Sequence, residues 1–288
     1  MAGTLPFRRV GVIGTGLIGG SFALAVRKHF PEMSVVGYDR PEIASRAASL
    51  GAISESAADI PTAMRSADLI YLALPIIPAL ETLPEIAKFA EDGALVTDAC
   101  STKAVICRAA HDIFHAGAKF LGGHPMAGKE QSGINHADAQ LFRGAPYALI
   151  GSQDVSEPRA TAFAELVAAI GARPVWCDAE THDWAVGIVS HLPQLVSVAL
   201  ARIVQDETDE TGLPLSLAGH GLQDMLRLAG SPYSVWRDIL LTNTENVSRA
   251  LDRVAQAVDY LRTRLASKEL EQEFHAANEV YKLLQKPR

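Results

Sequence analysis

Short apolar runs alternate with amphipathic stretches along the first 178 residues of the chain. The first apolar run, residues 7–13, precedes a stretch whose apolar residues recur at helical spacing up to Pro31. The pattern predicts further strands, with helices between them, at residues 34–39, 68–74, 94–98, 119–123, 147–151 and 173–177. Alternating strands and helices indicate a doubly wound α/β domain, whose sheet is mostly parallel with room for an antiparallel edge strand.

The pattern changes near residue 179, where the strand signals end. A long apolar helical stretch at residues 181–206, interrupted at Pro193, is followed by helical patterns at 213–230 and 233–284. In the last stretch apolar residues approach a 3.5-residue spacing, at Val247, Leu251, Val254, Val258, Leu261 and Leu265. We therefore predict an α/β domain over residues 1–178 and an all-α domain over 179–288. The helices of the second domain pack within the chain or across a homodimer.

Composition and charge narrow the class of protein. The 288 residues are 48% hydrophobic and carry a net charge of −7, which argues against a nucleic-acid or membrane-surface partner. The three cysteines form no C-x-x-C pair, so neither a disulfide framework nor a structural metal is expected. We also find no apolar run that approaches a membrane span and no signal peptide, and we expect a cytoplasmic protein.

A glycine motif joins the first strand to the first helix. Gly14, Gly16 and Gly19 give G-x-G-x-x-G, in which the glycines allow a tight turn, a close approach to a pyrophosphate and close packing of helix on strand. The helix N-terminus at Leu17 and Ile18 offers free N–H groups to the phosphates. This motif favours a Rossmann-type dinucleotide site over a ligand-free glycine turn.

The second predicted strand ends in Asp39, 25 residues after Gly14. This is close to the expected place of the carboxylate that holds the adenosine ribose, and it favours NAD because an acid repels a 2′-phosphate. The following Arg40 suits such a phosphate, so NADP remains possible. The alternative interpretation is that Asp39 is an ordinary turn residue at the end of a strand and binds no ribose.

Further polar residues follow strands at the same sheet edge, where ligands of open parallel sheets bind. Pro75, Ser101 and His124 each stand at such a position. A neutral His124 suits the removal of a hydroxyl proton as a hydride leaves the adjacent carbon, and Ser101 suits a hydrogen bond to the same hydroxyl. Each residue also has a purely structural alternative. Ser101 can be the N-cap of the following helix, and His124 can be a loop histidine whose hydrogen bonds go to backbone groups. A Ser–His nucleophile pair is a weaker interpretation, because it leaves the glycine motif unexplained.

The helical half carries two candidate substrate groups. His191 and Gln194 form a polar cluster on an apolar stretch, which indicates either a cavity or a structural kink at Pro193. Arg227 suits bidentate binding of a carboxylate, although an exposed helical arginine is the common case.

Several blocks taken in order resemble the prephenate/arogenate (cyclohexadienyl) dehydrogenase family of tyrosine biosynthesis. They are G-V-I-G-T-G-L-I-G-G-S, D-A-C-S-T-K, G-G-H-P-M-A-G, T-H-D-W-A-V-G-I-V-S-H-L-P-Q and D-M-L-R-L-A-G-S-P-Y-S-V-W-R-D-I. The resemblance implies a dinucleotide-binding domain followed by an all-α dimerisation domain. It also implies an NAD-dependent oxidative decarboxylation, in which ring C4 of prephenate loses a hydride and the C1 carboxylate leaves as carbon dioxide without a metal.

The resemblance assigns roles to individual residues. His124 accepts the 4-hydroxyl proton, Ser101 orients that hydroxyl, and Arg227 binds a substrate carboxylate. The other residues that it places at the substrate are His191 and Gln194 in the pocket, Glu130 and Asp183 in an ionic network near the arginine, Lys129, whose charge favours a dianion, and Trp236 from the partner subunit. Gln194 replaces a histidine that many relatives have, so the choice between prephenate and arogenate, or dual specificity, stays open.

Two other classes of protein share parts of this pattern. A β-hydroxyacid-type dehydrogenase has the same two-domain architecture, but such enzymes usually carry a lysine on the first long interdomain helix, where this chain has none. A non-enzymatic nicotinamide sensor needs the glycine motif and Asp39 but not Ser101, His124 and Arg227 together.

Overall fold

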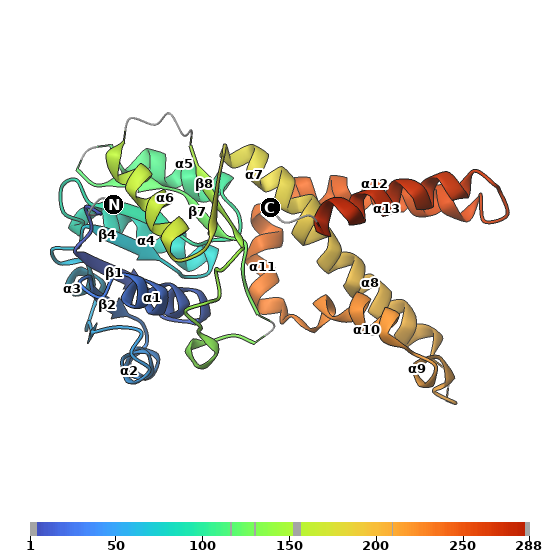
Figure 1. The fold of residues 1–288 in the computed structure, drawn as a ribbon, viewed down its shortest axis with the longest axis horizontal. Coiled ribbons are helices and arrows are strands. Elements are labelled where there is room, and N and C mark those ends of the chain that lie inside the picture. The colour runs from blue at the N-terminus through green and yellow to red at the C-terminus, as the bar shows by residue number, and fades with distance from the viewer. Residues whose placement is uncertain (1–4, 116, 130, 152–156, 209, 286–288) are drawn as a thin grey trace.

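The computed structural model describes residues 5–115, 117–129, 131–151, 157–208 and 210–285, and shows an α/β half beside an elongated helical half (Figure 1). A six-stranded sheet with the order β3-β2-β1-β4-β5-β6 forms the centre of the first half, and all its strands are parallel. Its strands are β1 (Arg9–Ile13), β2 (Ser34–Tyr38), β3 (Glu55–Ser56), β4 (Leu69–Leu72), β5 (Leu95–Asp98) and β6 (Lys119–Leu121). The predicted Rossmann-type fold is confirmed.

Helices cover both faces of this sheet, and each face has its own apolar core. One core contains Phe22, which stacks on Tyr71 with ring centroids 3.7 Å apart, and Phe163; the other contains Ile70, Leu83 and similar residues. The helices of this half are α1 (Leu17–His29), α2 (Pro41–Ser49), α3 (Ile60–Met64), α4 (Ile76–Phe89), α5 (Ala104–Ile113) and α6 (Pro158–Ala169). Both cores are formed by residues of this half, apart from Ile239 and the partly buried Trp236, which join the second core from the helical half.

The predicted strand at residues 119–123 is wrong in one respect: the chain leaves the parallel sheet at Gly122. It continues as β7 (Gly123–Pro125), which pairs antiparallel with β8 (Pro146–Ile150), and β8 pairs parallel with β9 (Arg173–Cys177) in a separate three-stranded sheet. The crossing is tight, because a Cβ on Gly123 would lie 2.6 Å from the carbonyl oxygen of Asp98. His124 therefore lies within β7 instead of following a strand.

The helical half begins with one continuous helical segment of 29 residues, Ala179–Glu207. It comprises α7 (Ala179–Val186), a π-helical turn (Gly187–His191) and α8 (Leu192–Glu207). Pro193 does not interrupt it, because the proline comes just after the π-helical turn, whose wider winding accommodates the missing N–H. By length and composition the segment is apolar enough to cross a membrane, since its most apolar window of 18 residues has a mean hydropathy of 1.5. The expectation that no run approaches such a length is corrected. Only 28% of its most apolar window is buried within one chain.

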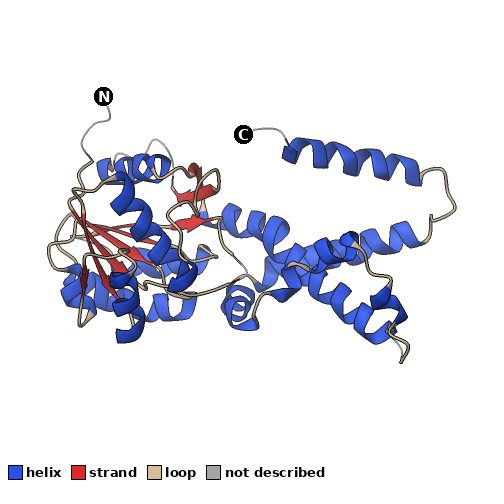
Figure 2. Cartoon of the chain, turned by 60° about the horizontal axis from the view of Figure 1, so that its bottom comes forward, coloured by secondary structure: helices blue, strands red, loops and turns tan. Residues whose placement is uncertain are grey.

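Shorter helices surround this segment. They are α9 (Leu213–Ser216), α10 (His220–Leu226), a 3-10 turn (Leu228–Gly230), α11 (Tyr233–Thr242), α12 (Thr244–Arg262) and α13 (Leu270–Gln285). Helix α11 packs against α4 of the α/β half, whereas α12 and α13 extend away from it (Figures 1 and 2).

Candidate active site

The glycine motif forms an open cradle at the end of β1. Gly14 has φ +91°, and a Cβ there would lie 2.5 Å from the carbonyl oxygen of Ala73. A Cβ on Gly19 would lie 1.8 Å from the carbonyl oxygen of Gly14, so helix and strand pack as closely as the motif requires. Gly16 has nothing within 4 Å of an added Cβ and is the N-cap of α1, ahead of Leu17 and Ile18. The cradle is thus closed behind by backbone and open in front, which fits a pyrophosphate at a helix N-terminus.

Asp39 faces this cradle from the end of β2. Its Oδ2 accepts hydrogen bonds from the backbone N–H of Thr15 at 2.7 Å and from its hydroxyl at 3.3 Å, and Oδ1 accepts the N–H of Arg40. The carboxylate is therefore tied to the cradle. The side chain of Arg40 is exposed and lies 3.9 Å from Glu42, and Pro75, the N-cap of α4, is also exposed.

A pocket of about 350 Å³ lies between the two halves of the molecule. Both halves contribute predicted site residues to its lining, namely Ser101, His124 and Lys129 from the α/β half and His191, Arg227 and Trp236 from the helical half. Ser101 is not the N-cap of α5, because that position belongs to Lys103, so the N-cap alternative is excluded.

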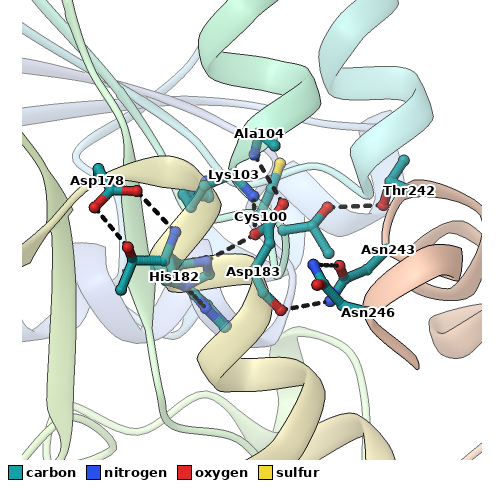
Figure 3. Close-up of polar contacts among 12 residues, drawn as sticks. Cys100, Lys103, Ala104, Asp178, His182, Asp183, Thr242, Asn243 and Asn246 are labelled. Atoms are coloured by element: carbon teal, nitrogen blue, oxygen red, sulfur yellow. Dashed lines mark hydrogen bonds and ion pairs between the residues drawn. The ribbon is translucent and has the colours of Figure 1, made fainter. Parts of the chain in front are cut away.

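His124 is the end of a buried hydrogen-bonded chain. Its Nδ1 lies 2.9 Å from Nε2 of His182, and Nδ1 of His182 lies 2.8 Å from Oδ1 of Asp183 (Figure 3). The carboxylate of Asp183 also accepts the backbone N–H groups of Lys103 at 2.7 Å and Ala104 at 2.9 Å, at the start of α5. Asp183 therefore joins the helical half to the α/β half.

A buried ion pair supports His124 from its other side. Nζ of Lys103 pairs with Oδ2 of Asp98, and both side chains are completely buried. Lys103 also donates to the carbonyl oxygen of Gly123 at 2.8 Å, while Oδ1 of Asp98 accepts the Gly123 N–H at 3.0 Å. Burial by itself would lower the pKa of Lys103, but the carboxylate of Asp98 outweighs it and the net shift is upward. The pair thus holds the backbone next to His124 in place.

The two pocket histidines are poor proton binders in the free protein. Burial lowers the pKa of His124 well below its usual 6.5, and the nearby His182, Lys103 and His191 lower it further. Burial lowers the pKa of His191 to about 4, against the opposing charge of Asp183. Both rings are therefore neutral near pH 7, which is the state that a general base requires.

The side chain of Asn243 connects this chain to His191. Its Nδ2 donates to the backbone carbonyl of Asp183 at 2.8 Å and lies 3.1 Å from Nδ1 of His191. Its Oδ1 accepts from Asn246 at 2.7 Å. Trp236 packs edge-on against His191, with ring centroids 5.8 Å apart, and its buried indole N–H has no hydrogen-bond partner among the described residues.

Two family models match the chain almost end to end. The prephenate dehydrogenase nucleotide-binding domain matches residues 22–176, and the prephenate dehydrogenase dimerization domain matches residues 178–279. This chain belongs to the prephenate dehydrogenase family.

Named members of the family agree with this assignment. A prephenate dehydrogenase of Lactococcus lactis is 35% identical over 96% of this chain and 77% of its own. The solved prephenate dehydrogenase of Aquifex aeolicus, in complex with hydroxyphenyl propionate and NAD+, has a TM-score of 0.89 at 28% identity and covers 98% of this chain and 100% of its own. The Synechocystis arogenate dehydrogenase has a TM-score of 0.80 at 28% identity and covers 95% of this chain and 99% of its own.

The structure gives further positions for residues that the family resemblance assigns. Asp183 contacts His182 and the start of α5 and is not among the described residues that line the pocket. Gln194 is buried in α8 and likewise is not among those lining residues. Trp236 lines the pocket of its own chain. Glu130 lies outside the described residues.

Sequence reasoning missed three polar residues that shape the site, Asp98, Lys103 and His182. Each stands inside a block quoted for the resemblance, within three residues of a residue that was predicted. Asp98 and Lys103 flank Ser101, and this spacing of opposite charges at a sheet edge was the available signal.

Proposed function

We propose that the protein oxidises and decarboxylates prephenate to 4-hydroxyphenylpyruvate with NAD. The observation that supports it most directly is the pocket. A neutral histidine and a serine on the α/β side face an arginine and a lysine on its rim, so one pocket offers a base together with anion-binding groups. Such a set suits a substrate that carries both a hydroxyl and carboxylates. Family membership supports the same activity.

In this mechanism His124 acts on the substrate hydroxyl. NAD, when bound in the glycine cradle, supplies the acceptor for the hydride that leaves ring C4. The free ring nitrogen of His124 takes the 4-hydroxyl proton as the C4–H bond breaks, and Ser101 orients that hydroxyl by a hydrogen bond. The C1 carboxylate leaves as carbon dioxide, its bonding electrons complete the aromatic ring, and the proton returns to the phenolate oxygen. The sum is one hydride transferred and one carbon dioxide released, with no net proton.

Arg227 and Lys129 hold the anionic substrate in this proposal. A guanidinium binds a carboxylate through two parallel hydrogen bonds, which fixes orientation as well as position. Nζ of Lys129 lies 3.1 Å from the carbonyl oxygen of His136 and 3.4 Å from Oδ2 of Asp138, so it is held at the pocket rim. The two cations match a dianion better than a substrate in which one acid is offset by an amine.

The preference for NAD over NADP rests on Asp39. Its carboxylate is tied to the cradle by Thr15, so it stays beside the place of the adenosine ribose. A 2′-phosphate there would meet a negative charge, while the exposed Arg40 is free to turn towards solvent. Use of NADP is therefore expected to be weaker.

We further propose a homodimer formed through the helical half, with the domain boundary between residues 178 and 179. The description of the matching family model as a dimerization domain supports this, as do the exposed apolar residues of α8, α12 and α13.

A four-way steady-state assay tests the function. Prephenate and arogenate are each supplied with NAD and with NADP, and kcat/KM is measured for all four pairs. We expect the largest value for prephenate with NAD. A larger kcat/KM for arogenate would show that arogenate is the preferred substrate. No turnover of either cyclohexadienyl compound would contradict the proposed function.

A further inference from the structure

Two separate chains of hydrogen bonds end on the two pocket histidines. One runs from the start of α5 through Asp183 and His182 to His124, and the other runs from α12 through Asn243 to His191. Each chain begins at groups whose hydrogens have fixed positions. The direction of every later hydrogen bond therefore follows, and with it the ring nitrogen that carries the proton.

The first chain begins at backbone N–H groups. Those of Lys103 and Ala104 donate to the two oxygens of Asp183, so the carboxylate acts as acceptor and Nδ1 of His182 must donate to it. Nε2 of a neutral His182 then holds a lone pair and accepts Nδ1–H of His124 at 2.9 Å. This leaves Nε2 of His124 without a proton, as an acceptor on the pocket side.

The second chain begins at a guanidinium, which only donates. Nη2 of Arg249 donates to Oδ1 of Asn246 at 2.5 Å, so Nδ2 of Asn246 donates to Oδ1 of Asn243 at 2.7 Å. Nδ2 of Asn243 must then donate to Nδ1 of His191 at 3.1 Å. The proton of the neutral His191 ring is therefore on Nε2, and this ring is a donor.

We propose that His182 with Asp183, and Asn243 with Asn246, are positioning pairs that impose opposite tautomers on His124 and His191. The pocket then presents one imidazole acceptor and one imidazole donor. The acceptor matches a substrate hydroxyl, and the donor matches a carboxylate or keto oxygen of the same substrate. This inference rests on the proposed function, because it assigns the two rings to two groups of that substrate.

The tautomers themselves are tested without any turnover. Long-range ¹H–¹⁵N spectra of the ¹⁵N-labelled free protein distinguish the two neutral tautomers of an imidazole, and the variants His124→Asn and His191→Asn assign the signals. We expect the Nδ1–H form for His124 and the Nε2–H form for His191 at pH 7.5. The same tautomer at both residues would overturn the proposal even if the enzyme turns over prephenate.

Steady-state kinetics test the functional consequence. In His182→Phe the acceptor for His124 is lost, and we expect kcat to fall about 10- to 100-fold while the KM for prephenate changes little. In Asn243→Asp a carboxylate faces Nδ1 of His191 and draws the proton to that nitrogen. The donor is then lost, and we expect the KM to rise about tenfold with a smaller change in kcat. Thr181→Ala is the matched control, since it removes only the hydroxyl hydrogen bond to Asp178 at the start of α7 and keeps the backbone N–H bond to the same carboxylate.

The pH profile separates positioning from a general structural defect. The groups that face His124 are His182 from α7, Lys103 from the start of α5 with its partner Asp98, and His191 from the π-helical turn. The neutral base is the active form, so activity falls as the pH drops through the pKa of His124. His182→Phe removes both the acceptor that stabilises the imidazolium of His124 and a ring whose charge lowers the pKa of His124, so we expect the acid limb of kcat/KM to move, whereas a general structural defect leaves it in place.

The outcomes distinguish the two proposals. If the wild-type protein turns over prephenate but His182→Phe and Asn243→Asp keep wild-type kcat and KM, the positioning roles are wrong and the function stands. Changes of equal size in kcat and KM, in a variant whose acid limb has not moved, would also contradict the positioning roles. If the wild-type protein turns over neither cyclohexadienyl compound, the function fails, and the spectra alone decide the tautomers.

Discussion

The two halves of the molecule differ in how they bury their apolar residues. In the α/β half, large side chains such as Phe22, Tyr71 and Phe163 are completely buried by their own half. In the helical half, Leu265 is 74% exposed and Phe274 is 72% exposed in a single chain. Exposed apolar surface on this scale is typical of an interface. The first half therefore has a core of its own, whereas the second leaves apolar helix surface that the proposed homodimer would cover.

The halves also differ in what they supply to the pocket. The α/β half supplies the proposed base and the cofactor cradle, and the helical half supplies the proposed anion-binding arginine. The buried hydrogen bonds of Asp183 and the contact between the hydroxyls of Thr102 and Thr242 at 2.7 Å fix the halves to each other. Because the two halves supply different groups, a substitution in one half can impair its own contribution to the pocket and leave the contribution of the other half unchanged.

The largest effect is expected in the α/β half. His124→Asn removes the base but keeps a polar side chain of smaller size, and we expect kcat to fall roughly 10²–10⁴-fold, the usual contribution of general base catalysis. Binding of NADH, followed by fluorescence titration, should be unchanged because the cradle lies elsewhere in this half. An unchanged kcat would show that another group takes the proton.

A smaller effect is expected from the helical wall of the pocket. Arg227→Ala removes the proposed carboxylate contact, and a hydrogen bond to a charged group contributes about 1.5–3 kcal/mol, so the KM for prephenate should rise roughly 10- to 100-fold. Steady-state kinetics measure this. Arg202→Ala is the control, because that arginine pairs with Asp206 on the exposed part of α8. If both variants have the same KM, the contact is absent.

The smallest effect is expected at the outer helices. Val258 is 57% exposed in one chain and lies on the apolar repeat of α12. Val258→Asp loses about 1.5 kcal/mol or more of apolar burial across the proposed interface, which raises the dimer dissociation constant by roughly tenfold or more. Sedimentation velocity over a concentration series measures it, with Gln256→Asp as a control on another face of the same helix. Equal dissociation constants for the two variants would place the interface elsewhere.

The sequence predicts the fold well where local periodicity decides it. Five of the six parallel strands follow from apolar runs, and the cradle follows from the spacing of Gly14, Gly16 and Gly19. The sixth, β3 (Glu55–Ser56), is not predicted, because it consists of two exposed polar residues. The break at Gly122 is not marked by periodicity, because Gly122 and Gly123 have no side chains that could alternate between two faces of a sheet. Only the close approach of Gly123 to Asp98 shows why the chain must leave the sheet there.

The site is predicted less completely, because its supporting residues depend on tertiary partners. Lys103 follows Ser101 in the sequence like an ordinary solvated lysine, and only the position of Asp98 explains its complete burial. Asp183 carries a charge that suits an ionic network near Arg227. Which of several donors it meets is decided by how α7 packs against α5, and helical periodicity does not contain that information.

The π-helical turn at Gly187–His191 has a consequence for the evolution of this chain. Such a turn holds one residue more than an α-helical turn, and each α-helical residue rotates the chain by about 100°. The wider turn absorbs its extra residue, so α7 and α8 keep the relative rotation that a regular helix would give them. Deleting one residue from α7 would rotate α8 by about 100° relative to His182, whereas deleting one residue of the π-helical turn would not. That deletion would instead displace the side chains inside the turn, among them His191 and its contact with Asn243. The packing of α8 should therefore tolerate a deletion in this turn, and the cost of the deletion should fall on the pocket.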